Sequence, residues 1–97
     1  MRIIAKKPIR QFWESFPDAE GPLKAWYADA KHADWKTPND IKKHYASASI
    51  VANNRVVFNI GGNKYRLICH VRYDLGILFV RFVGTHEEYD KVDAASV

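Results

Sequence analysis

The sequence contains few of the features that mark secreted, membrane-spanning or disulfide-stabilised proteins. It has a single cysteine, Cys69, which excludes an intramolecular disulfide. Because Cys69 lies within an apolar run, we expect it to be a small core residue in a protein of the reducing cytoplasm. No apolar run approaches the roughly 20 residues of a membrane span, and the N-terminal segment MRIIAKKP lacks the apolar core of a signal peptide. These absences predict a cytoplasmic protein that does not contact a membrane.

Signals for a metal ion, a cofactor or a serine nucleophile are also missing. Gly61-Gly62-Asn63-Lys64 lacks the spacing and the following helix of a phosphate-binding loop, so a hairpin turn is the better interpretation. No serine has the neighbours of a catalytic nucleophile. The histidines have no metal-ligand spacing, and a single cysteine argues against zinc; they are His32, His44, His70 and His86. We therefore expect no metal site and no cofactor.

The composition describes one compact domain that spans residues 1–97. Hydrophobic residues make up 47% of the chain and aromatic residues 13%, which is enough for a core, with little to spare in so short a chain. The net charge of +4 favours an anionic partner. Charge alone does not distinguish RNA, DNA, an acidic protein or a membrane surface.

The first half of the chain has the periodicity of helices. Residues 2–5, Arg-Ile-Ile-Ala, predict a short first strand. Pro8 suits the first turn of a helix, and Pro17 ends that helix. Between the two prolines, apolar residues share one helical face; they are Ile9, Phe12, Trp13 and Phe16.

A second amphipathic helix follows a predicted turn at residues 18–22, so the two helices form a hairpin. Its apolar face carries Leu23, Trp26, Tyr27 and Ala30. We expect the tryptophans on these two helical faces to pack in the core rather than to stack on bases. Thr37 then resembles an N-cap with Pro38 at the first helical position, which predicts a brief helix to about Tyr45.

The second half of the chain alternates with period two in three successive runs, which predicts three strands. Short turns at residues 61–63 and 74–76 join them as antiparallel neighbours in a meander. One face of this sheet is predicted to be continuously apolar, with Val56, Phe58, Ile60, Leu67, Cys69, Val71, Leu78, Val80 and Phe82. The helices therefore cover this face, and the predicted fold class is α+β.

The opposite face of the predicted sheet gathers basic side chains and stays open. It carries Arg55, Asn59, Arg66, His70, Arg72 and Arg81, with Val57, Ile68, Ile77 and Phe79 between them. We expect Val57, Ile77 and Phe79 to be exposed there. Arginines on a solvated sheet face are common, so a plain surface and a binding surface are equally good interpretations of the pattern.

Two chemistry-bearing side chains follow the last predicted strand. His86 and Tyr89 are three residues apart, so both can lie on one face of a single helical turn. From these residues alone, a helical cap with a packed tyrosine is preferred over a functional pair.

The strings VVFNIGGNKYRLI and VGTHEEYDKV together carry a family resemblance. They resemble the HigB-type toxins of bacterial type II toxin-antitoxin modules, which belong to the RelE superfamily of messenger-RNA interferases. The resemblance also covers the helical hairpin and residues 35–41, with the pattern W-x-x-P-x-D-I. It implies a small RelE-like domain in which an N-terminal helical hairpin packs on one face of a mainly antiparallel β-sheet meander.

The resemblance implies an endoribonuclease toxin that cuts messenger RNA during translation on the ribosome. A cognate antitoxin with a helix-turn-helix DNA-binding domain would neutralise it. RNA is cut without a metal when its 2′-hydroxyl attacks the neighbouring phosphate, provided that protein groups transfer the protons and stabilise the added charge. The noncatalytic alternatives are an RNA-binding domain and a protein-interaction domain that use the same basic sheet face.

The resemblance implies catalytic roles for four residues. Arg66 matches the arginine that superfamily toxins use against the scissile phosphate, with Lys64 as its helper. His86 is a candidate for proton transfer because a histidine side chain has an unperturbed pKa of about 6.5. Tyr89 is expected to hydrogen-bond the phosphate or to stack on a base.

Other polar residues are expected to bind RNA rather than to take part in bond breaking. Those on the sheet face contact RNA or the antitoxin; they are Arg55, His70, Arg72 and Arg81. Lys42 and Lys43, on the third predicted helix, are expected to contact ribosomal RNA through phosphate attraction. Asn63 either orients the substrate or closes the hairpin turn, and the turn is preferred.

Overall fold

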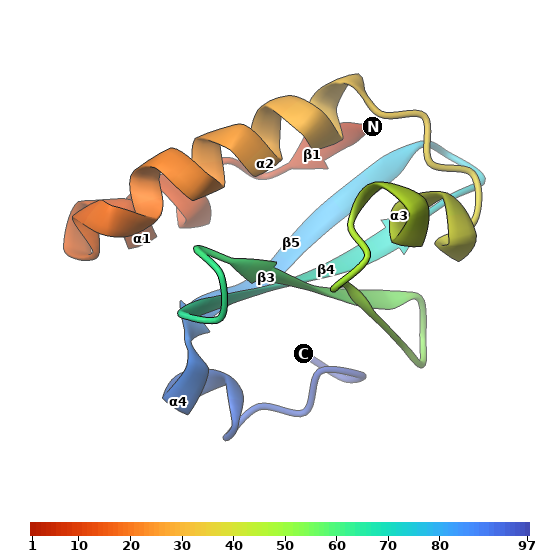
Figure 1. The fold of residues 1–97 in the computed structure, drawn as a ribbon. Coiled ribbons are helices and arrows are strands. Elements are labelled where there is room, and N and C mark those ends of the chain that lie inside the picture. Colours follow the sequence, from red (N-terminus) through yellow and green to blue (C-terminus); the bar gives the residue numbers. More distant parts are fainter.

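The computed structural model describes residues 1–97 and places two helices over one face of a five-stranded sheet (Figure 1). The helices are α1 (Lys7–Ser15), α2 (Glu20–His32), α3 (Pro38–His44) and α4 (His86–Tyr89), with a 3-10 turn at Pro17–Ala19. The strands are β1 (Arg2–Ile4), β2 (Ser49–Val51), β3 (Arg55–Ile60), β4 (Tyr65–Arg72) and β5 (Ile77–Thr85). The predicted α+β class, with the helical hairpin on one face of a mainly antiparallel sheet, is confirmed. None of the helices combines the length and the apolar character that crossing a membrane requires.

The strand order in the sheet is β1-β5-β4-β3-β2. The meander of β3, β4 and β5 is antiparallel, as the alternating runs predict, and the predicted first strand pairs in parallel with residues 77–79 of β5. Strand β2 was not predicted. It joins β3 through a tight hairpin in which Asn53 and Asn54 have positive φ. Asparagine tolerates this left-handed conformation better than most side chains, so the Asn-Asn pair is the sequence signal for this hairpin.

The helical hairpin forms as predicted, except that residues 18–22 are not a separate turn. Helix α2 already begins at Glu20, because Pro22 occupies one of the first helical positions, where a backbone N–H has no partner inside the helix. Pro17 ends α1 and begins the 3-10 turn. Helix α3 starts at the predicted N-cap, where Thr37 and Asp40 exchange hydrogen bonds in a capping box.

The core lies between the helices and the apolar face of the sheet. Trp26 is buried and half-buried Trp13 packs against the core, which confirms that the tryptophans of the helical hairpin are packing residues. The Trp26 ring meets Phe58 of β3 edge-on, with ring centroids 5.4 Å apart. Cys69 is fully buried, and burial raises the pKa of its thiol well above the ordinary value, so it is the core residue expected.

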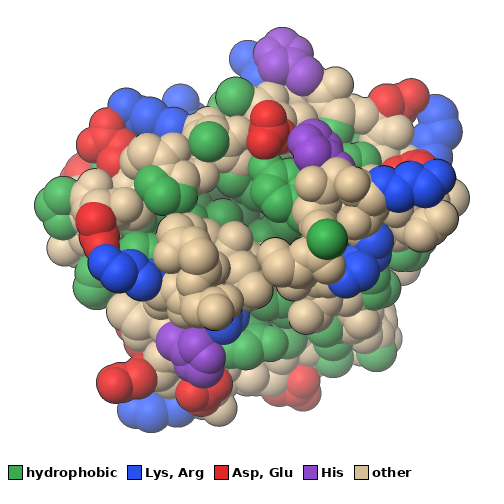
Figure 2. All heavy atoms as spheres, viewed as in Figure 1, with side chains coloured by type: hydrophobic (Ala, Val, Ile, Leu, Met, Phe, Trp, Pro, Cys, Tyr) green, Lys and Arg blue, Asp and Glu red, His purple; other side chains and the backbone are tan.

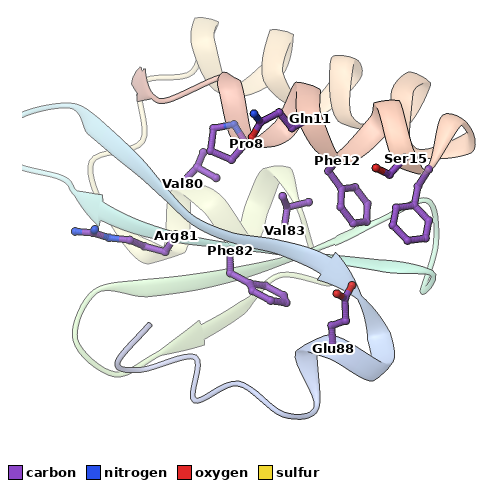
Figure 3. Close-up of a pocket in the computed structure, with 10 residues that line it drawn as sticks. Pro8, Gln11, Phe12, Ser15, Val80, Arg81, Phe82, Val83 and Glu88 are labelled. Atoms are coloured by element: carbon purple, nitrogen blue, oxygen red, sulfur yellow. The ribbon is translucent and has the colours of Figure 1, made fainter.

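A β-bulge corrects one face assignment on β5. The pairing register between β4 and β5 shifts at Ile68 and Cys69, so that Arg81 is an extra residue on β5. Beyond the bulge, Phe82 points away from the helices and Val83 points toward them, as Figure 3 shows. The prediction that Phe82 joins the core face is therefore wrong, because strict alternation does not anticipate an inserted residue.

The face away from the helices is partly covered by the C-terminal segment, residues 90–97, which folds back along the sheet (Figure 1). Arg55 donates hydrogen bonds from Nε and Nη2 to the main-chain oxygen of Val97, at 3.2 and 2.9 Å. The predicted exposure of Val57 is wrong: Val57 is 2% exposed, and its cross-strand neighbour Ile68 is 0% exposed. The second face is open only in part, because apolar side chains on it are also buried.

Candidate functional site

The β3–β4 loop and the start of α4 lie side by side at one end of the sheet (Figure 1). The loop spans residues 61–64, and its two glycines adopt positive φ values of 61° and 71°. The side-chain oxygen of Asn63 accepts a hydrogen bond from Asn59 Nδ2 at 3.4 Å, which supports the turn-closing role. The backbone N–H of His86 donates to the oxygen of Lys64 at 3.2 Å. This hydrogen bond joins the loop to α4.

Arg66 occupies the second position of β4, and its guanidinium lies beside α4. Its Nη1 donates to the main-chain oxygens of Asn63 and Tyr65, at 3.0 and 3.1 Å. Its Cζ lies 5.8 Å from the ring centroid of Tyr89, which is a cation–π distance. No protein group accepts a hydrogen bond from Nε or Nη2. These free N–H groups on a half-exposed side chain form a fork that suits the oxygens of a phosphate.

A capping box begins α4 and sets the direction of its side chains. Thr85 Oγ1 accepts from the N–H of Glu88 at 3.2 Å, and Glu88 Oε1 accepts from the N–H of Thr85 at 2.8 Å. His86 and Tyr89 both belong to this turn, so the predicted helical cap is present. The exposed His86 ring places Nδ1 3.2 Å from Oδ2 of Asp90. No protein group forms a hydrogen bond with Nε2 of the imidazole.

The Lys64 side chain points away from this group, toward the helical hairpin. Its Nζ lies 2.8 Å from Oδ2 of Asp18, and the Tyr65 hydroxyl donates a short hydrogen bond to Oδ1 of the same carboxylate. The hydrogen bonds from Lys64 and Tyr65 lower the pKa of Asp18, and the carboxylate in turn raises the pKa of Lys64. The structure therefore brings the main chain of Lys64 to the site and directs its charged group to Asp18.

A second basic cluster lies at the other end of β4 and consists of Arg55, His70, Arg72 and Arg81. Burial lowers the pKa of His70, and the positive charges of Arg55, Arg81 and Arg72 lower it further. Arg72 forms an ion pair with Asp74, with Nη2 and Oδ2 3.0 Å apart. Because Arg55 binds Val97, Arg81 is the member of this cluster that is both exposed and without an acidic or main-chain partner.

The two lysines of α3 lie apart from Arg66. Helix α3 packs on the helical side of the sheet, whereas α4 lies on the other side (Figure 1). Lys42 Nζ donates to the main-chain oxygens of Ala46 and Ala48, at 2.6 and 2.7 Å, and so fixes the chain after α3. Lys43 is exposed. The structure does not bring these lysines together with the Arg66 group.

Gly84 and Asp18 shape the site but were not predicted. Gly84 lies opposite Arg66 on β5, and a β-carbon at Gly84 would stand 2.5 Å from Cζ of Phe82 and 3.1 Å from Oε1 of Glu88. A side chain at this position would force Phe82 or Glu88 to shift, so the position favours glycine, and the GTH string was its sequence signal. Asp18 has no such signal, because it is separated from Lys64 by 46 residues.

A space-filling view and a close-up show what lies around the site (Figures 2 and 3). On the side drawn in Figure 2, basic and acidic side chains alternate around an apolar centre instead of forming one cationic patch. A groove of about 430 Å³ lies between α1 and β5, beyond the part of β5 that pairs with β1 (Figure 3). Phe12 and Val83 give it apolar walls, and Arg81 and Glu88 add one charge of each sign.

Comparisons with known proteins agree with the resemblance seen in the sequence. A family model for the HigB toxin, described as a RelE-like toxic component of a toxin-antitoxin system, matches residues 19–92. The chain is similar to an mRNA interferase HigB of Escherichia coli, with 28% identity over 94 residues that cover 95% of this chain and 91% of that protein. An mRNA interferase HigB of Shigella flexneri is 28% identical over 92 residues, which cover 93% of this chain and 88% of the relative. The span that the family model matches contains Arg66, His86 and Tyr89.

Proposed function

This chain belongs to the HigB family of RelE-like toxic components of toxin-antitoxin systems, and we propose that it is an endoribonuclease that cleaves messenger RNA. Its HigB relatives carry the name mRNA interferase. The observation that carries the proposal is the Arg66 guanidinium, which lies beside Tyr89 with Nε and Nη2 unpaired. A charged fork held at the end of a strand can stabilise the charge that develops on a reacting phosphate.

In the proposed reaction, the 2′-oxygen of RNA attacks the adjacent phosphorus and the bond from phosphorus to the 5′-oxygen breaks. The products are a 2′,3′-cyclic phosphate and a free 5′-hydroxyl, so this step consumes neither water nor a metal-bound nucleophile. Arg66 binds the non-bridging oxygens, whose negative charge grows as the phosphorus becomes pentacoordinate. One preorganised donor of this kind contributes roughly 100-fold to 1,000-fold in rate.

His86 is the proposed proton-transfer group. The contact between its Nδ1 and Asp90 favours the tautomer with a proton on Nδ1, so that Nε2 can accept or deliver a proton. Tyr89 orients the guanidinium with the face of its ring and offers its hydroxyl to the phosphate. Lys64 acts through the loop that it anchors, because Asp18 holds its ammonium group.

We also propose that a cognate antitoxin neutralises this toxin and that cleavage takes place on ribosomes in the cytoplasm. The family description, a component of a toxin-antitoxin system, supports the antitoxin partner. Its helix-turn-helix domain and the ribosome are predictions from the resemblance. Of the basic side chains predicted to bind RNA, Arg81 and Lys43 are exposed and free to meet phosphates, since Arg55, Arg72 and Lys42 have intramolecular partners.

Induced expression of the parental chain and of the Arg66→Ala variant tests the proposal. The parental protein should arrest growth and shorten messages, and the cut ends should carry a 2′,3′-cyclic phosphate and a 5′-hydroxyl. Arg66→Ala should do neither, whereas Arg10→Ala, which removes an exposed charge from α1, should behave like the parent. A noncatalytic RNA-binding domain would bind messages without shortening them. A protein-interaction domain would leave RNA intact and unbound.

A further inference from the structure

Asp18 bridges the helical hairpin to the β3–β4 loop. Its Oδ2 accepts a hydrogen bond from Lys64 Nζ at 2.8 Å, and its Oδ1 accepts one from the Tyr65 hydroxyl. The buried Tyr65 ring packs edge-on against Phe12 and Phe16, with ring centroids 5.3 and 5.7 Å apart. One carboxylate therefore fixes two consecutive residues at the point where the loop enters β4.

The two residues that Asp18 fixes also hold the main chain around the proposed catalytic groups. Arg66 Nη1 donates to the oxygen of Tyr65 at 3.1 Å. The N–H of His86 donates to the oxygen of Lys64 at 3.2 Å. Asp18 thus touches neither Arg66 nor His86, but each of them is hydrogen-bonded to a residue that Asp18 holds.

We propose that Asp18 is a positioning residue of the RNA-cleaving site, an inference that rests on the proposed function. It acts on the reaction by holding Lys64 and Tyr65, and through them the backbone that carries Arg66 and His86. A catalytic group misplaced by about 1 Å can lose about 100-fold in rate, so a loop that is no longer held should cleave slowly. The Asp18 side chain is 52% exposed, and exposed ion pairs contribute little to folding, so the effect should lie in the rate.

The test compares Asp18→Ala and Asp18→Asn with Glu20→Gln. Glu20 is the matched control, because it also pairs with a lysine, but that lysine, Lys24, lies on the same helix. Single-turnover cleavage of a ribosome-bound message measures the rate, and titration with the protein measures the affinity. We expect Asp18→Ala to cleave about 10-fold to 100-fold more slowly with an affinity within about twofold of the parental value. The cleavage rate of Asp18→Asn should lie between those of the parental protein and Asp18→Ala, because the amide oxygen of asparagine can still accept the hydrogen bond from the Tyr65 hydroxyl.

Amide hydrogen exchange provides a readout that does not depend on cleavage. In Asp18→Ala, the N–H of His86 should exchange faster, because its acceptor belongs to Lys64, while that of buried Ile68 keeps its protection. Tyr65→Phe removes the other hydrogen bond to the carboxylate. In the double variant, Tyr65→Phe should slow cleavage by a smaller factor than it does in the parental protein, because Asp18→Ala has already removed the same hydrogen bond.

Cleavage at the parental rate by folded Asp18→Ala, or an equal loss in Glu20→Gln, would overturn the proposal. A loss confined to affinity would also overturn it, because it would place Asp18 in RNA binding. If the parental chain cuts no message, the proposed function fails. Unchanged exchange at His86 in Asp18→Ala would separately refute the positioning role.

Discussion

An arginine and a histidine lie near each end of β4, yet the proposed catalytic site lies at only one end. At the first end, main-chain oxygens hold Arg66 without cancelling its charge, and His86 contacts a carboxylate. At the other end, Asp74 neutralises Arg72, while burial and three arginines lower the pKa of His70. The comparison teaches that a basic side chain on the sheet face can act on a phosphate only if its intramolecular partners leave its charge available.

The largest expected difference between the two ends concerns the histidines. His86→Ala should slow cleavage by roughly 100-fold to 10,000-fold, the range for loss of a general acid or base. His70→Ala should change the rate by less than about 10-fold, because burial and the neighbouring arginines lower the pKa of His70, so that few of these side chains carry a proton to donate near neutral pH. Single-turnover cleavage with both variants measures the difference. Equal losses would remove the distinction between the ends, and a small loss in His86→Ala alone would leave that residue a positioning role.

The second-largest expected difference between the two ends concerns the arginines. Arg66→Ala should lower the cleavage rate by roughly 100-fold to 1,000-fold, because in the proposed reaction its free N–H groups stabilise the charge that grows on the phosphate. Arg72→Ala should leave the rate within about 10-fold of the parental value, since Asp74 already occupies its guanidinium. Both side chains are half-exposed, so neither change leaves a core cavity, and urea denaturation should confirm similar stability. Cleavage at the parental rate by folded Arg66→Ala would end its catalytic assignment.

The two ends also differ in how much of them the sequence could predict. His86 and Tyr89 are neighbours on one helical turn, and Arg66 lies beside a glycine loop, so local patterns and the family strings were enough to select them. The Asp18 contact joins residues that are 46 positions apart, and no periodicity encodes it. The bulge at Arg81 depends on how β5 registers against β4, which local alternation does not determine.

The sheet face that lies away from the helices was also only partly predictable from the sequence. Alternation correctly placed its side chains on β3 and β4, opposite the core face. It did not show that the C-terminal segment would fold back over that face, because an irregular segment has no period from which to infer its path. The binding of Arg55 to Val97 follows from that path. The meander was therefore predictable, and the openness of its second face was not.

A smaller effect is expected from the glycine that lies opposite Arg66. In Gly84→Ala, the new β-carbon would meet Phe82 and Glu88 at distances that force one of them to move. Such overpacking costs about 1–3 kcal/mol of unfolding free energy. Gly21→Ala is the matched control, because a β-carbon at Gly21 meets nothing within 4 Å. Urea denaturation of both variants measures the difference, and equal stability of Gly84→Ala and the parent would show that the Phe82 ring relaxes freely.

The smallest expected effect is a pH dependence of stability at the Arg72 end. His70 has a folded-state pKa below the ordinary value of 6.5 because of burial and of the positive charges of Arg55, Arg81 and Arg72. Below about pH 6.5 the histidine of the unfolded chain becomes protonated. The histidine of the folded chain stays neutral until the pH falls to its own, lower pKa. Between these two pKa values the unfolded chain binds more protons, so the free energy of unfolding falls as the pH drops. His70→Gln should lose less stability between about pH 7.5 and about pH 5.5 than the parent, whereas His32→Gln, exposed on α2, should lose as much as the parent.

Added salt should weaken the same effect, because it screens the arginine charges that help to lower the pKa of His70. Urea denaturation at the two pH values, at low and at high salt, therefore separates the contribution of the arginines from that of burial, which salt does not change. Identical pH dependence in His70→Gln and the parent would contradict the assignment. It would mean that the cationic cluster does not act on His70, and the electrostatic contrast between the two ends of β4 would then rest on Arg66 and Arg72 alone.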